Sequence, residues 1–146
     1  MTEFSLPRLP GVLEVLIETP RWSPVKRRAD GRVDFITPVP CPYNYGCVPE
    51  LGSGDGDPLD VVVLGPRLPR GARVRVPVVG VMGFMDAGCA DPKVICSPRP
   101  LRAVDRWSLA LFFRVYAVFK RVLHFARGRR TGATRYVGWL GELTPP

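Results

Sequence analysis

Histidine is almost absent from this 146-residue sequence, since His124 is the only one, and no two of the four cysteines form a C-x-x-C pair. A structural zinc site usually needs several closely spaced cysteine or histidine ligands, so this composition disfavours one. A secretory signal peptide is also missing, because Met1–Gly11 has neither a basic start nor an apolar run. We therefore predict reduced thiols and a cytoplasmic protein.

Long apolar runs are lacking too. The most apolar stretch, Trp107–Phe125, is interrupted by Arg114, Lys120 and Arg121. A membrane-spanning helix needs roughly 18 or more consecutive apolar residues, so the sequence predicts no transmembrane segment. A role for this stretch as an amphipathic helix on a membrane surface stays open.

Lysine is scarce, with three lysines among the 21 basic residues, and the net charge of +8 is unevenly placed. Residues 1–98 hold equal numbers of basic and acidic residues, whereas residues 99–135 hold ten basic residues and one acidic residue, Asp105. Such a basic segment fits an anionic partner, either nucleic acid or a lipid surface. The simpler alternative, which we favour, is an arginine-rich helix face in contact with water.

Proline (17) and glycine (15) are, by contrast, abundant and spread along the chain, which is typical of short strands joined by turns. The length fits a single domain, residues 1–146. Apolar positions at helical spacing predict one helix, Asp105–Arg127. We therefore expect an α+β, mainly β, fold with a small barrel. Alternation, β-branched runs and the turn dipeptide Asp30-Gly31 predict strands at Val12–Ile17, Pro24–Arg28, Arg32–Ile36, Val61–Leu64, Arg73–Met82 and Lys93–Cys96.

Five aspartates gather in two groups. Asp55, Asp57 and Asp60 fall within six residues of a glycine-rich loop that leads into a strand, and Asp86 and Asp91 follow another apolar strand. Carboxylates crowded in this way repel one another unless a divalent cation neutralises them. Oxygen ligands without histidine or cysteine select magnesium, manganese or calcium. The pattern predicts phosphate chemistry on a metal or a structural metal, with an ordinary acidic loop as the remaining alternative.

Five short segments resemble, in order and spacing, the motifs of soluble (family I type) inorganic pyrophosphatases. The segment Asp55–Asp60 reads DGDPLD, which resembles the family's signature. Together the five segments lie within residues 13–116. The other four are Ile17–Pro20 followed by Pro24–Lys26, then Pro42–Gly46 (PYNYG), then Gly80–Met82 with Asp86, Asp91 and Lys93, and last Phe112-Phe113 with Tyr116.

The resemblance implies a five-stranded barrel of the oligonucleotide-binding (OB) type with flanking helices, and a homo-oligomer. It also implies Mg²⁺-dependent hydrolysis of inorganic diphosphate to two phosphates, with Mn²⁺ as a substitute metal. Asp57 would orient or deprotonate the attacking water. The other roles that the resemblance implies are metal binding by Asp55, Asp60, Asp86, Asp91 and Glu18, and phosphate binding by Lys26, Tyr45, Lys93 and Tyr116.

Three positions depart from the family's pattern. Arg28 stands where the family has an acidic residue, and Ala117 replaces the lysine that follows the helix tyrosine. The strand Val33–Ile36 lacks the family's arginine, although Arg32 lies just before it. Two phosphate-binding cations are thus expected to be missing, unless Arg28 and Arg32 replace them. Two alternative functions follow: a non-catalytic or slow protein that binds a phosphorylated ligand, and a hydrolase of an organic diphosphate.

Overall fold

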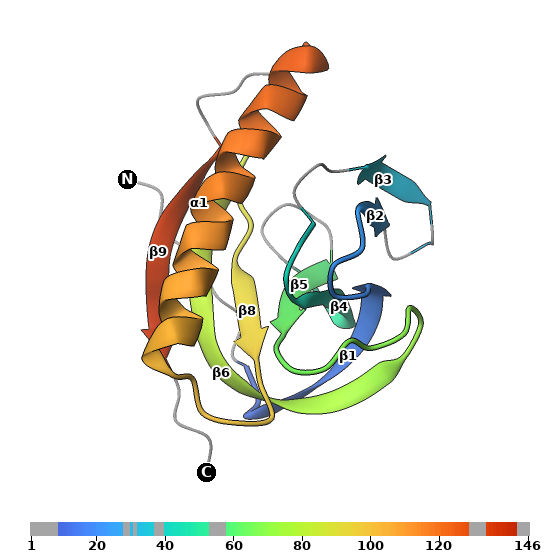
Figure 1. Ribbon diagram of the computed structural model, residues 1–146, viewed down its shortest axis with the longest axis vertical. Helices are drawn as coiled ribbons and strands as arrows, with labels where there is room; N and C mark the ends of the chain where they lie inside the picture. The colour runs from blue at the N-terminus through green and yellow to red at the C-terminus, as the bar shows by residue number, and fades with distance from the viewer. Residues whose placement is uncertain are drawn as a thin grey trace.

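Five strands close into a barrel (Figure 1). The computed structural model describes residues 9–27, 30, 32–36, 40–52, 58–128 and 134–142. The barrel strands are β1 (Val12–Thr19), β4 (Asn44–Gly52), β5 (Pro58–Val63), β6 (Arg73–Asp86) and β8 (Lys93–Cys96). They follow the order β1-β4-β5-β8-β6, and β6 pairs with β1 to close the ring. β5 and β8 run parallel, and the other neighbours in the ring run antiparallel. This confirms the predicted five-stranded OB-type barrel.

The longest strand, β6, pairs with several other strands along its length. Its first five residues, Arg73–Pro77, pair with β1, and the later ones pair with β8 and with β9 (Arg135–Glu142). Gly80 allows Trp139 of β9 to pack closely, because a Cβ atom at this glycine would lie 2.7 Å from the Trp139 ring. The far end of β6 folds back onto β7 (Cys89–Ala90). The predicted strand Arg73–Met82 forms the first part of β6, and β4, β7 and β9 were not predicted.

One helix, α1 (Ala103–Ala126), packs against β9 on the outside of the barrel (Figure 1). The Asp105 carboxylate accepts hydrogen bonds from the Arg102 backbone N–H at 2.8 Å and from the Arg99 guanidinium at 2.7 Å. These bonds stabilise the first turn, where backbone donors otherwise lack partners. Gly128, with φ of +72°, follows the helix end. The predicted helix is confirmed, and within the described ranges no helix is long and apolar enough to cross a membrane.

β2 (Val25–Arg27) and β3 (Val33–Ile36) form a small antiparallel hairpin, as the turn dipeptide predicts. The hairpin lies beside the barrel (Figure 1). Beyond the end of α1, Arg127 donates a hydrogen bond to the backbone oxygen of Asp34 in β3, at 3.2 Å. This contact links the hairpin to the helix.

The buried side chains form two clusters. One fills the barrel and is aliphatic, with Val61 among its members, and the other joins the barrel wall to α1 and is rich in aromatic rings. Val61 and Val62 face different clusters, because successive side chains of a strand point to opposite sides. Tyr45 and Tyr116 both belong to the aromatic cluster or pack against it. The predicted tyrosines of the site therefore meet between the barrel and the helix.

Candidate active site

Lys93 lies at the centre of the predicted residues. It opens β8, where it pairs in register with Asp60 of the parallel strand β5. Its Nζ atom donates to Asp60 Oδ2 and to Asp91 Oδ2, at 2.7 Å in each case, so these two oxygens are at most twice that distance apart. Although burial alone would lower the pKa of Lys93, the two carboxylates raise it well above its ordinary value. Lys93 is therefore a charged ammonium that holds two aspartates together.

Tyr45 lies beside this cluster with an unused hydroxyl group. Its side chain is buried, and its Oη atom has no hydrogen-bond partner among the residues that the structure describes. The Nζ atoms of Lys26 and Lys93 lie 4.9 and 5.6 Å from the centre of the Tyr45 ring. Burial alone would raise the pKa of Asp60, but Lys93 and Lys26 lower it below its ordinary value. A buried donor beside two ammonium groups suits an anion such as a phosphate.

Tyr116 approaches the same region from α1. Its ring packs against Phe84 and Phe112, with the ring centres 5.7 Å apart in both pairs. Burial raises the pKa of Tyr116, which keeps its hydroxyl group protonated at neutral pH. Tyr116 can therefore donate a hydrogen bond from a fixed position.

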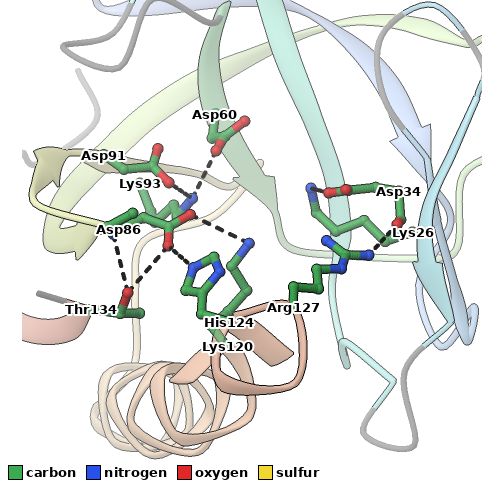
Figure 2. A network of polar contacts seen from close by, with 11 residues as sticks. Lys26, Asp34, Asp60, Asp86, Asp91, Lys93, Lys120, His124, Arg127 and Thr134 are labelled. Atoms are coloured by element: carbon green, nitrogen blue, oxygen red, sulfur yellow. Dashed lines mark hydrogen bonds and ion pairs between the residues drawn. The ribbon is translucent and has the colours of Figure 1, made fainter. Parts of the chain in front are cut away.

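Asp86, at the end of β6, forms a second group with side chains that follow it in the sequence (Figure 2). His124 Nε2 lies 2.7 Å from Asp86 Oδ1, and Lys120 Nζ lies 3.3 Å from Asp86 Oδ2. Thr134 adds a hydroxyl group at 3.4 Å from Asp86 Oδ1. Burial alone would raise the pKa of Asp86, but Lys120 and His124 lower it below its ordinary value. The carboxylate is thus held ionised by partners from outside the barrel.

Glu18, near the end of β1, is a buried carboxyl group with too little positive charge around it. Burial raises its pKa to about 7, even though Lys26 and Lys93 act to lower it. A carboxyl group with such a pKa is partly protonated at neutral pH, and a nearby cation would ionise it.

The residues present fit a hard divalent cation in part. Asp60 and Asp91 present neighbouring carboxylate oxygens, and Glu18 adds a carboxyl group that lacks positive charge. Within the part of the chain that the structure describes, no three histidine, cysteine, aspartate or glutamate side chains form a ready-made metal site. Asp55 and Asp57 lie outside the described residues. The described carboxylates would therefore supply some of the ligands.

Three of the predicted cations have different outcomes. Arg28 lies outside the described residues. Arg32 is not brought to the cluster, because its side chain is 84% exposed and its Nε atom lies 3.8 Å from Asp30 Oδ2 in the hairpin turn. Lys26 is brought to the cluster, and its Nζ atom also lies 3.9 Å from Asp34 Oδ2.

The helix brings an ammonium group to Asp86 from a position outside the motifs. Ala117 is 1% exposed and packs in the aromatic cluster, whereas Lys120 points its ammonium group at Asp86 (Figure 2). Sequence reasoning missed both Lys120 and His124. The signal was present, because Tyr116, Lys120 and His124 recur every fourth residue and so share one helix face, where a purely structural helix would place apolar residues.

Comparisons with known proteins identify one family. The family model described as inorganic pyrophosphatase matches residues 15–124. The inorganic pyrophosphatase of Saccharolobus solfataricus is 37% identical over 100 residues, which cover 63% of this chain and 58% of that protein. The inorganic pyrophosphatase of Xanthomonas campestris is 42% identical over 99 residues, covering 62% of this chain and 56% of the relative. The chain thus matches less than three fifths of either relative's length.

A solved structure extends the likeness over more of the fold. The crystal structure of the inorganic pyrophosphatase from Thermus thermophilus superposes with a TM-score of 0.71 at 29% sequence identity, covering 92% of this chain and 87% of that one. The similarity therefore includes the barrel and the helix that carry the residues described above.

Proposed function

Because the chain belongs to the inorganic pyrophosphatase family, we propose that it hydrolyses inorganic diphosphate to two phosphates. The observation that carries this proposal is the buried group in which Lys93 joins Asp60 and Asp91 beside the unused hydroxyl group of Tyr45. Carboxylates that can hold a divalent cation stand next to ammonium and hydroxyl donors that can hold phosphate oxygens. Such a pairing of ligand types suits a substrate that is a metal–phosphate complex.

The metal would be Mg²⁺, with Mn²⁺ as a substitute, held by Asp55, Asp60, Asp86 and Asp91 with help from Glu18. When bound, it would supply Lewis-acid polarisation of the phosphate oxygens and a lowered pKa for a bound water. This ligand set is the one that the family resemblance implies. Support comes from Asp60 and Asp91, which share the ammonium group of Lys93, and from Glu18, whose pKa is raised by burial.

The chain's own residues would orient the substrate and move the proton. Water adds to one phosphorus atom, the bond from that atom to the bridging oxygen breaks, and the second phosphate leaves with the bridging oxygen. Asp57 accepts the proton of the attacking water. Lys26, Lys93, Tyr45 and Tyr116 donate hydrogen bonds to the phosphate oxygens as negative charge moves to the leaving group. Lys93 can do so because an ammonium has three donors and two are used by aspartates.

Phosphate release tests this function directly. The purified chain with inorganic diphosphate and Mg²⁺ should release two phosphates per diphosphate, and a chelator should stop the release. Release from an organic diphosphate alone would favour the second alternative function. Binding of diphosphate without any release would favour the non-catalytic alternative.

Metal binding should also stabilise the fold. Millimolar Mg²⁺ or Mn²⁺ is expected to raise the melting temperature, because a ligand that binds only the folded state adds about 2.7 kcal/mol at a hundred times its dissociation constant. Binding should release protons near pH 7, because the pKa of Glu18 is about 7 and a bound cation would lower it. Calorimetry in buffers of different ionisation enthalpy measures that release, with sodium chloride at matched ionic strength as the control. An unchanged melting temperature without measurable binding would contradict the metal site.

Three further expectations stay predictions. Self-association has support from the outer face of α1, where seven apolar side chains are between 40% and 77% exposed: Val104, Trp107, Leu111, Val115, Val118, Val122 and Phe125. A cytoplasmic location has support from four cysteines that form no disulfide with one another. Contact of the basic segment 99–135 with nucleic acid or a membrane surface stays the less favoured alternative to a solvated helix face.

A further inference from the structure

We infer that Lys120 of α1 is a third substrate-binding lysine, whose ammonium group contacts a phosphate oxygen of the bound diphosphate. This inference rests on the proposed function, because it names a further contact for the same substrate. Nothing in the motif resemblance assigns a role to this residue.

The distribution of lysine in the chain is the first observation. Figure 2 shows all three lysines in one polar network, while the other 18 basic residues of the chain are arginines. The exposed fractions of the lysine side chains are 3% for Lys93, 12% for Lys120 and 21% for Lys26. A solvated arginine such as Arg102 is 65% exposed. A chain that otherwise uses arginine thus retains lysine only where a compact ammonium group is enclosed by the candidate site.

The second observation is that the two carboxylate oxygens of Asp86 have different partners. His124 and Thr134 both lie on Oδ1, at 2.7 and 3.4 Å, whereas Lys120 lies on Oδ2 at 3.3 Å (Figure 2). The carboxylate is therefore positioned by partners other than Lys120. Lys120 can turn from Oδ2 to a phosphate oxygen, and Asp86 keeps its orientation because Oδ1 stays bound.

The third observation is that the three ammonium groups lie in one polar network (Figure 2). Within it, the Nζ atoms of Lys26 and Lys93 lie 4.9 and 5.6 Å from the centre of the Tyr45 ring, and Lys120 lies on Asp86. A diphosphate anion has several negative oxygens, so it can accept hydrogen bonds from more than one of these groups.

The helix gives Lys120 a fixed base from which to act. Phe113 and Leu109 of α1 are fully buried against the barrel wall, and Arg127 ties the helix end to the hairpin that carries Lys26. A side chain on such a packed element reaches its ligand with little loss of conformational freedom elsewhere. Ala117 packs in the core, so its side chain does not reach the site. Lys120 lies about one turn later on the same helix.

The test compares Lys120→Met and Lys120→Arg with Arg114→Met, which removes a charge from the same helix next to β9. Methionine keeps most of the length of the lysine side chain but donates no hydrogen bond. We expect Lys120→Met to raise the KM for diphosphate about tenfold to a hundredfold, the range for a hydrogen bond to a charged group. Binding of methylene diphosphonate, measured by calorimetry with Mg²⁺, should weaken by a similar factor. Lys120→Arg should recover part of the loss, and Arg114→Met should behave as the unaltered chain.

The outcomes separate this inference from the proposed function. If Lys120→Met binds methylene diphosphonate as tightly as the unaltered chain, the inference is overturned while hydrolysis stands. If the metal affinity falls with unchanged diphosphonate affinity, Lys120 acts only on Asp86, and the inference is again overturned. If the unaltered chain binds diphosphonate but releases no phosphate, the proposed function fails, and the binding comparison still decides the role of Lys120. If it binds no diphosphonate at all, both fail.

Discussion

Lys93→Met is expected to destabilise the protein by about 3–5 kcal/mol without divalent cations, because it leaves two buried carboxylates unpaired. In the unaltered chain Nζ of Lys93 binds Asp60 and Asp91 at 2.7 Å, and the lysine side chain is 3% exposed. Urea unfolding measures the loss. The matched control is Lys26→Met, whose side chain is 21% exposed and should cost less. A loss below about 1 kcal/mol for Lys93→Met would contradict the role of Lys93 as the link between the two aspartates.

The loss should depend on pH in a direction set by two shifted pKa values. The pKa of Asp60 is lowered from 3.8, so its stabilising contribution is present above that pH and is lost as pH falls through the folded-state pKa. The pKa of Lys93 is raised from 10.5, so its contribution is present below that pH and is lost only in stronger base. The unaltered chain and Lys93→Met should therefore differ most near neutral pH and converge in acid. Mg²⁺ should narrow the difference at neutral pH, because a cation can neutralise the same carboxylates.

Four of the five barrel strands, β1, β5, β6 and β8, could be predicted from the sequence because they carry their own signals, whereas β4 was not predicted. Val61–Leu64 and Lys93–Cys96 are short, mostly apolar runs bounded by turns. The first overlaps β5 (Pro58–Val63), and the second has the same bounds as β8. The residues of β9 lack such a pattern, since Gly138 and Gly141 interrupt the segment. It forms a strand because β6 extends beyond the barrel and offers Gly80, against which Trp139 packs. That contact joins residues about sixty positions apart, and no local pattern reveals it.

The candidate site could likewise be predicted only in part. Asp60, Asp91 and Lys93 lie in short motifs, and the pairing of β5 with β8 brings them together. Lys120 and His124 lie in no motif, and only the packing of α1 against the barrel places them on Asp86. The family's motif has its helix lysine at position 117, where this chain has a buried alanine, and the ammonium group that contacts Asp86 belongs to Lys120, about one turn further along the helix.

Asp57→Asn is expected to lower kcat for diphosphate hydrolysis by two to four orders of magnitude, roughly the contribution of a well-placed general base. Asparagine keeps the size of aspartate but cannot accept the proton of the attacking water. In the sequence Asp57 directly precedes Pro58, and Pro58 is the first residue of β5, the strand that carries Asp60. The proposed base and the proposed metal ligand are therefore three residues apart in the sequence, and their substitutions should have different effects.

Asp60→Asn should mainly weaken Mg²⁺ binding, so that high Mg²⁺ restores part of its activity, whereas Asp57→Asn should stay slow at every Mg²⁺ concentration. The neutral control is Asp30→Asn, because Asp30 is a solvated residue of the hairpin turn whose side chain is 57% exposed. Steady-state phosphate release over a range of Mg²⁺ and diphosphate concentrations separates the three variants. If Asp57→Asn retains the kcat of the unaltered chain, Asp57 has no part in proton transfer, and the base must be sought among the other carboxylates.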